Sequence, residues 1–121
     1  GGASGGILPS HMSDIPLEFG SLEEYGCFVG SGGIVVFSDQ DNIKQIVLNL
    51  LRFFAEESCG QCTPCRLGCD KLINLTQQET RDEVLIEDII SVMRDASICG
   101  LGQAAPNPLS TALRYMKSDL I

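Results

Sequence analysis

The sequence has 121 residues, of which 44% are apolar, 20% charged and 6% aromatic. This length fits one ordinary domain or two small ones, and it excludes a dinucleotide-binding domain joined to a substrate domain. Sixteen acidic and eight basic residues give a formal net charge of −8, which excludes the clustered cationic surface that nucleic-acid binding requires. No apolar run approaches the ~20 residues that span a bilayer, so we expect no membrane insertion. The chain opens on Gly1-Gly2 without a Met, and we expect a piece of a longer protein.

Charge and glycine content divide the chain into two parts. All eight Lys and Arg residues lie at Lys44 or later, whereas nine of the thirteen glycines lie at or before Gly33. A shift in composition of this kind is typical of a domain boundary, and we place it near Ser38–Asn42. Residues 1–40 are predicted to form one domain and residues 41–121 a second.

The first part is predicted to hold turns, a short helix and one strand. Ser21 and Glu24 have the spacing of a capping box, which predicts a helical turn over Ser21–Tyr25 that Gly26 closes. Ile34–Phe37 is a continuous β-branched and aromatic run, typical of a buried strand. Neither glycine cluster matches the phosphate-binding pattern G-x-G-x-x-G, so we interpret the glycines as turn residues.

The second part is predicted to be a bundle of four short helices, which makes the fold mostly α. The first helix follows a cap at Asp41 or Asn42, and the third runs from Asp82 to Ala96. The second and fourth each begin with a capping residue followed by proline, at Thr63-Pro64 and Asn107-Pro108. The expected inward positions are Ile43, Ile46, Val47, Leu50, Phe53 and Phe54, then Cys65, Cys69, Leu72 and Thr76, then Leu85, Ile86, Ile89, Ile90 and Met93, and finally Leu109, Ala112, Leu113 and Met116.

Three cysteines stand close together at the start of the second predicted helix. Cys59, Cys62 and Cys65 form a C-x2-C-x2-C run, which can wrap one face of an iron–sulfur cubane and give one sulfur to each of three irons. Structural zinc sites usually pair two separated C-x2-C knuckles, so a zinc-stabilised interaction module is the alternative. Disulfides are disfavoured, because the sequence shows no signal peptide and cysteines this close strain mutual pairing.

A 4Fe–4S cluster needs a fourth ligand, and Cys27, Cys69 and Cys99 are the remaining cysteines. Cys69 completes the run seen in bacterial ferredoxins, but there the fourth Cys ligates a second cluster, and six Cys cannot build two four-Cys sites. A helix starting at Pro64 also carries Cys69 a full turn, roughly 5–6 Å, away from Cys65. Cys99 follows the third helix in a glycine-containing loop that lets backbone approach sulfide. We therefore choose Cys99, and interpret Cys69 and Cys27 as small buried hydrophobic residues.

Several separated motifs in the right order carry a resemblance to a known family. The motifs are Gly1–Gly6, Leu8-Pro9, Asp14–Leu17, Gly30–Ile34, Glu57–Arg66, Ser97–Gly102 and Ala105–Pro108. Together they resemble the C-terminal part of the family of NADH-binding flavoprotein subunits. That family includes the flavoprotein subunit of respiratory NADH:quinone oxidoreductase, the diaphorase subunit of NAD-reducing hydrogenase and the β subunit of NAD-dependent formate dehydrogenase. The wording of Ala105–Ser110 favours the formate dehydrogenase or hydrogenase branch.

The resemblance implies a four-helix iron–sulfur bundle preceded by the C-terminal portion of a β-grasp (SLBB) domain. It implies that Cys59, Cys62, Cys65 and Cys99 hold the 4Fe–4S cluster, in agreement with the spacing, and that relatives commonly have Thr or another small residue at the position of Cys69. FMN and NAD are then expected to bind in the rest of the parent subunit. The cluster would relay single electrons between FMN and an iron–sulfur centre of a partner subunit, in the cytoplasm. An SLBB ligand-binding module with a purely structural helical tail is the remaining alternative.

Three further features carry weaker expectations. Arg66 follows the third clustered Cys, and is either a cation beside the cluster or an ordinary surface residue. His11 is the only histidine and has no Cys or acidic pattern around it, which indicates a surface residue. Leu120-Ile121 are expected to be exposed apolar residues that mark either a partner contact or a domain boundary.

Overall fold

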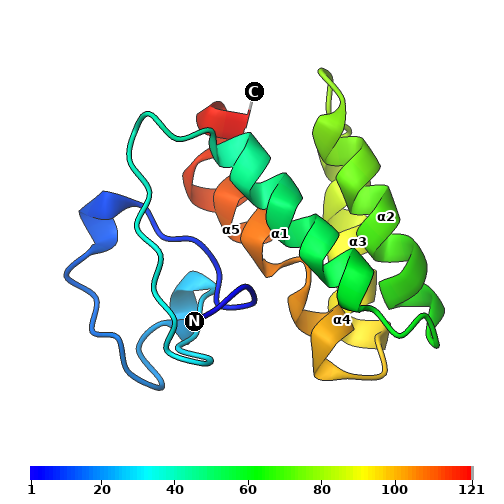
Figure 1. Ribbon diagram of the computed structural model, residues 1–121, viewed down its shortest axis with the longest axis horizontal. Helices are drawn as coiled ribbons and strands as arrows, with labels where there is room; N and C mark the ends of the chain where they lie inside the picture. Colours follow the sequence, from blue (N-terminus) through cyan, green and yellow to red (C-terminus); the bar gives the residue numbers. More distant parts are fainter. Residues whose placement is uncertain (121) are drawn as a thin grey trace.

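The computed structural model describes residues 1–120, which form five α-helices and three short 3₁₀ helices (Figure 1). The α-helices are α1 (Ile43–Glu57), α2 (Thr63–Gln77), α3 (Glu83–Ala96), α4 (Gly100–Ala104) and α5 (Asn107–Tyr115), and the 3₁₀ helices are η1 (Ser10–Met12), η2 (Glu23–Tyr25) and η3 (Lys117–Leu120). Within the described residues no segment forms a β-strand. None of the described helices has both the length and the apolar character needed to cross a membrane.

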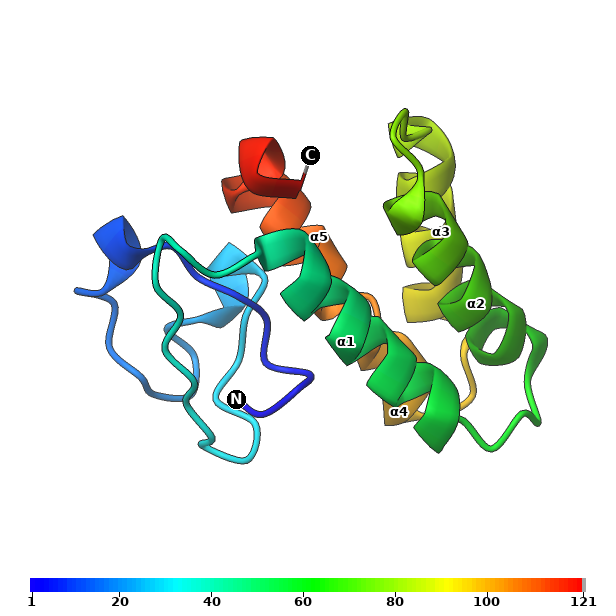
Figure 2. The same cartoon turned by 45° about the horizontal axis from the view of Figure 1, so that its top comes forward.

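The helices pack as a bundle, which confirms the predicted mostly α fold. Helix α2 packs against both α1 and α3, while α5 lies along α1 on the side away from α3 (Figures 1 and 2). The short helix α4 contacts α2 and α3, and it is the one helix that the sequence analysis missed. The four predicted helices are all present.

Two of the four predicted helix starts are confirmed residue for residue. The side chain of Asn42 accepts a hydrogen bond of 3.0 Å from the backbone N–H of Gln45, and Asp82 accepts one of 3.0 Å from Leu85. At α2 and α5 the helix begins one residue earlier than predicted, so that proline occupies the second helical position. Proline is tolerated there because the amides of the first turn have no intrahelical partner.

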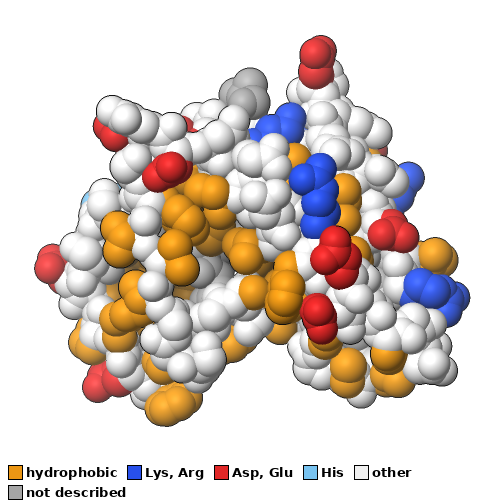
Figure 3. All heavy atoms as spheres, in the orientation of Figure 1, with side chains coloured by type: hydrophobic (Ala, Val, Ile, Leu, Met, Phe, Trp, Pro, Cys, Tyr) orange, Lys and Arg blue, Asp and Glu red, His pale blue; other side chains and the backbone are white. Residues whose placement is uncertain are grey.

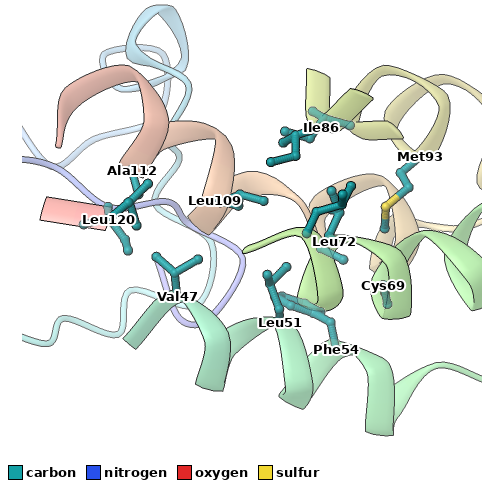
Figure 4. Close-up of a cluster of buried hydrophobic side chains, with 14 of the residues drawn as sticks. Val47, Leu51, Phe54, Cys69, Leu72, Ile86, Met93, Leu109, Ala112 and Leu120 are labelled. Atoms are coloured by element: carbon teal, nitrogen blue, oxygen red, sulfur yellow. The ribbon is translucent and has the colours of Figure 1, made fainter. Parts of the chain in front are cut away.

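The core lies between the four longer helices, and Leu120 closes one end of it (Figure 4). The inward faces predicted for α2, α3 and α5 are confirmed at their centres, since Leu72, Ile86 and Leu109 are fully buried. The face predicted for α1 is rotated from the true one, because Leu51 is fully buried whereas Phe53 is 47% exposed. Helix α1 packs against α2 on one side and α5 on another, so its buried face is not the single stripe that periodicity suggested.

The C-terminal segment is part of this core, and the expectation for Leu120 is therefore wrong. Its side chain is fully buried, and its carbonyl oxygen accepts a hydrogen bond from the guanidinium of Arg81. Ile121 lies outside the described residues.

The N-terminal segment docks on α5 through hydrogen bonds between residues far apart in the sequence. The backbone N–H of Ile7 donates to Oγ1 of Thr111 over 2.9 Å, and the hydroxyl of Tyr115 donates to the carbonyl oxygen of Tyr25 over 2.7 Å. The side chain of Asn107 donates to the carbonyl oxygen of Ser4. Asn107 therefore ties the N-terminal segment to α5 and does not cap the helix, as the sequence had suggested.

The buried strand predicted at Ile34–Phe37 is wrong. These residues are extended but unpaired and exposed, with Val36 87% accessible. A buried strand needs neighbouring strands for its backbone groups and a layer that covers its side chains, and no other described segment supplies them. Figure 3 shows hydrophobic side chains gathered on the part of the surface that residues 1–42 form.

The helical turn near Tyr25 is present, but the capping box is not. Helix η2 is a single 3₁₀ turn, and Gly26 closes it with a φ of 81°, as predicted. The hydroxyl of Ser21 bonds backwards to the carboxylate of Glu18 over 2.6 Å and leaves the amides of the turn uncapped.

Candidate metal centre

The C-x2-C-x2-C run occupies the loop between α1 and α2 and the first turn of α2. Cys59 is exposed in the loop, Cys62 precedes the first residue of α2 and is half-buried, and Cys65 is buried in the first turn. Gly60 has a φ of 75°, a left-handed conformation that favours glycine and lets the loop turn sharply after Cys59. The guanidinium of Arg66 donates a 2.7 Å hydrogen bond to the carbonyl oxygen of Gly60, so Arg66 fixes the loop as well as contributing a cation.

Backbone amides from two distant segments meet at Cys62. The amide of Ile98 holds the pKa of the Cys62 thiol below its usual range, and the amide of Cys65 and the charge of Arg66 act in the same direction. Both amides stabilise the thiolate, which is the form that binds metals. Because Ile98 directly precedes Cys99, this contact brings the Cys99 segment to the start of α2.

Cys65 faces a hydroxyl from the end of α1. Its Sγ lies 3.2 Å from Oγ of Ser58, and the backbone N–H of Gly60 donates to that same oxygen over 3.3 Å. A thiolate carries no proton, so with Cys65 deprotonated Ser58 is the donor. Hydrogen bonds to a charged sulfur stabilise the thiolate further.

Helix α4 approaches the start of α2 as closely as glycine permits. A Cβ placed on Gly102 would lie 2.8 Å from the Cβ of Cys65 and 2.5 Å from Oγ of Ser97, both too short for real contacts. Cys99 directly precedes α4 and is exposed, and nothing lies within 4 Å of a Cβ placed on Gly100. The predicted close backbone approach is therefore present, and Gly102 provides it.

The structure brings the cysteine-bearing segments together without gathering the four thiols into one tetrad. Within residues 1–120 no group of three or more His, Cys, Asp or Glu side chains is arranged to hold a metal ion. Cys59 and Cys99 are the two exposed members of the predicted set. Four thiolates without a cation repel one another, so closure of such a site is coupled to metal binding.

Cys69 and Cys27 are buried, as predicted. Cys69 is 1% exposed among the core side chains (Figure 4), where burial first, and then the charge of Cys65, raise the pKa of its thiol to about 12. Cys27 is 3% exposed and packs against Gly6, where a Cβ would lie 2.6 Å from its sulfur. Burial also raises the pKa of Cys27. His11 is exposed, as predicted.

The residues around the cysteines fit an iron–sulfur cluster. Soft thiolates are the ligands that such clusters use, and hydrogen bonds to sulfur are the usual second layer. Ser97 is the buried side chain of the described residues whose polar atom has no hydrogen-bond partner, and it lies at the contact between α4 and α2. The sequence analysis gave no role to Ser58, Ser97 or Gly102, because their contacts depend on the packing of helices distant in sequence. Fold and site together define the class as a helical iron–sulfur binding domain.

Comparison with known families gives the same class. Residues 45–121 match the family described as the NADH-ubiquinone oxidoreductase-F iron–sulfur binding region, and the chain belongs to this family. The family carries a 4Fe–4S cluster, as predicted.

Individual relatives resemble almost the whole chain. The NADP-reducing hydrogenase subunit HndC of Solidesulfovibrio fructosivorans is 33% identical over 119 residues, which are 93% of this chain and 24% of that protein. A subunit of the NADH-quinone oxidoreductase of Rickettsia typhi is 33% identical over 127 residues, which are 99% and 30%. A crystal structure of NAD+-reducing nickel–iron hydrogenase in the H2-reduced state superposes with a TM-score of 0.83 and 31% identity, covering 98% of this chain and 21% of that one. The chain thus spans less than a third of the length of each.

Proposed function

We propose that Cys59, Cys62, Cys65 and Cys99 hold one 4Fe–4S cluster and that the chain serves as an electron-transfer module. The observation that carries this proposal is the amide of Ile98 at Cys62, because it joins the segment of the fourth cysteine to the other three. A bound 4Fe–4S cluster supplies one-electron oxidation and reduction. The family of the chain supports that chemistry.

The residues of this chain bind the cluster asymmetrically in the proposed site. Cys65 is buried, and Gly102 lies against it, so this side excludes water. Cys59 and Cys99 are exposed, so the opposite side faces outward. A redox partner would approach this outward side. The amides of the first turn of α2 and the hydroxyl of Ser58 offset part of the negative charge of the thiolates.

For the whole protein, we propose a role in exchanging electrons with a nicotinamide cofactor through FMN. The relatives are named as subunits of NADH-quinone oxidoreductase and NADP-reducing hydrogenase, which supports FMN and NAD sites in the remainder of such a subunit. This chain would relay electrons between FMN and an iron–sulfur centre in another subunit. A formate dehydrogenase parent stays a prediction, as does a cytoplasmic location.

We also propose that a domain boundary lies near residue 40. The family match begins at residue 45. Just before it, the carboxylate of Asp41 accepts hydrogen bonds from the backbone N–H and the hydroxyl of Ser38, which lower the pKa of Asp41 and close a turn ahead of α1. Residues 1–40 would then be the end of a β-grasp domain, and residues 41–121 the cluster-binding bundle.

Reductive titration tests the electron-transfer function. Protein reconstituted anaerobically with iron and sulfide should lose its broad absorption near roughly 400 nm on addition of about one electron equivalent of dithionite per chain, and regain it on reoxidation. A spectrum that dithionite leaves unchanged would contradict the proposal. The Cys27→Ser variant is the matched control, since it removes a buried thiol outside the proposed ligand set and should titrate like the parent protein.

A further inference from the structure

Ser97 holds a buried hydroxyl with no hydrogen-bond partner in the described residues. Its side chain is buried, with the whole residue 5% exposed. Its backbone is fully bonded, because its N–H donates to the carbonyl oxygen of Met93 over 3.2 Å and its carbonyl accepts 3.0 Å from the side chain of Gln103. The residue is therefore fixed in place. Since an unpaired buried hydroxyl is destabilising, its presence requires an explanation.

The hydroxyl lies against the ligand segment of α2. Oγ of Ser97 would be 2.5 Å from a Cβ on Gly102, and the Cβ of Cys65 would be 2.8 Å from the same position. Ser97 and Cys65 therefore face each other across the single hydrogen that Gly102 carries in place of a side chain. An alanine at position 102 would occupy this space.

Ser97 and Ser58 hold equivalent places in the fold. Ser58 follows the last residue of α1 and its N–H bonds to Phe54, while Ser97 follows the last residue of α3 and its N–H bonds to Met93. Each serine adopts an extended conformation and stands just before a proposed cysteine ligand. The hydroxyl of Ser58 has a sulfur neighbour, Cys65 Sγ at 3.2 Å, whereas that of Ser97 has none among the described residues.

We infer that the Ser97 hydroxyl donates a hydrogen bond to the sulfur of the bound cluster on the side of Cys65, and thereby raises its reduction potential. The inference rests on the proposed function. Reduction adds one negative charge to the cluster, so a donor at its sulfur stabilises the reduced form more than the oxidised form. Ser97 acts through this bond and is a positioning residue, without a ligand role of its own.

The Ser97→Ala variant tests this inference through the reduction potential. The reconstituted variant should contain as much iron and sulfide as the parent protein. Its equilibrium constant for reduction should fall roughly threefold to tenfold, where tenfold corresponds to about 59 mV for a one-electron couple. Ser91→Ala, the same change on the exposed face of α3, should leave the potential unchanged. Equal potentials in the parent and Ser97→Ala proteins, with full clusters in both, would overturn the inference.

Thermal unfolding of the cluster-free proteins supplies a second readout. Removal of an unpaired hydroxyl should leave the unfolding midpoint of Ser97→Ala equal to or above that of the parent protein. A lowered midpoint would show that the hydroxyl has a structural partner, and would overturn the inference. Absence of iron and sulfide from the reconstituted parent protein would overturn the proposed function itself, which separates the two failures.

Discussion

The hydroxyl oxygen of Ser58 lies 3.2 Å from the sulfur of Cys65 and receives the backbone N–H of Gly60 at 3.3 Å. Ser58 thus joins the end of α1 to the first turn of α2 across the whole cysteine loop. Because the amide of Gly60 already occupies a lone pair of the hydroxyl oxygen, the hydroxyl proton is available to the sulfur. This contact connects the fold of the bundle to the chemistry of the thiols.

Loss of this contact should weaken metal retention. We expect the Ser58→Ala variant to assemble a cluster and to release iron to a chelator about tenfold faster, because second-layer hydrogen bonds orient ligands and typically contribute 10–100-fold in affinity. Decay of the absorption near roughly 400 nm measures the rate. Ser118→Ala, on the exposed surface of η3, is the control. Equal release rates in the three proteins would contradict the role of Ser58.

The close approach of α4 to α2 predicts a sharp difference between two glycines of one helix. Gly102→Ala would place a Cβ 2.5 Å from Ser97 and 2.8 Å from Cys65, and should lower the free energy of unfolding by about 1–3 kcal/mol. Gly100→Ala meets nothing within 4 Å, and should be neutral or slightly stabilising. Urea unfolding of the cluster-free proteins measures both. A Gly102→Ala protein as stable as Gly100→Ala would refute this packing of α4 against α2.

Docking of the N-terminal segment on α5 depends on Thr111. Thr111→Val preserves the shape of the side chain but leaves the buried N–H of Ile7 without its 2.9 Å acceptor, and should lower the free energy of unfolding by about 1–3 kcal/mol. Thr76→Val is the matched control, because this equally buried hydroxyl bonds only to the carbonyl oxygen of Leu72 in its own helix. Equal effects of the two substitutions would argue against the contact with Ile7.

The buried thiol of Cys69 predicts a pH dependence in the cluster-free protein. Burial raises its pKa from 9.0 to about 12, so in alkaline solution the unfolded chain loses this proton before the folded protein does. The stabilisation is complete below pH 9 and is lost as the pH rises towards 12. The free energy of unfolding should therefore fall more steeply above pH 9 in the parent protein than in Cys69→Ala. Parallel curves for the two proteins would contradict the prediction.

Local patterns in the sequence were sufficient to predict most of the helices. The caps at Asn42 and Asp82 are short-range features, and the buried positions of α2 and α3 follow from helical periodicity. Helix α4 was missed because two of its five residues are glycines, which disfavour helices. Its packing against Cys65 overrides that preference.

The strand and the polar contacts of the site show where local patterns fail. Ile34–Phe37 has strand composition, but a strand also needs partners that no described segment provides. Spacing identified Cys59, Cys62 and Cys65 as a unit. The contacts of Ser97 and Gly102 join segments more than thirty residues from the C-x2-C-x2-C run, and a single sequence carries no pattern that reports them.

Metal analysis of the anaerobically purified protein tests the central claim, that Cys59, Cys62, Cys65 and Cys99 hold one 4Fe–4S cluster, most directly. The account predicts a brown protein with about four irons and four sulfides per chain, unchanged in Cys69→Ser and lost or converted in Cys99→Ser. A colourless protein with one zinc per chain, or iron that is lost in Cys69→Ser and retained in Cys99→Ser, would contradict it.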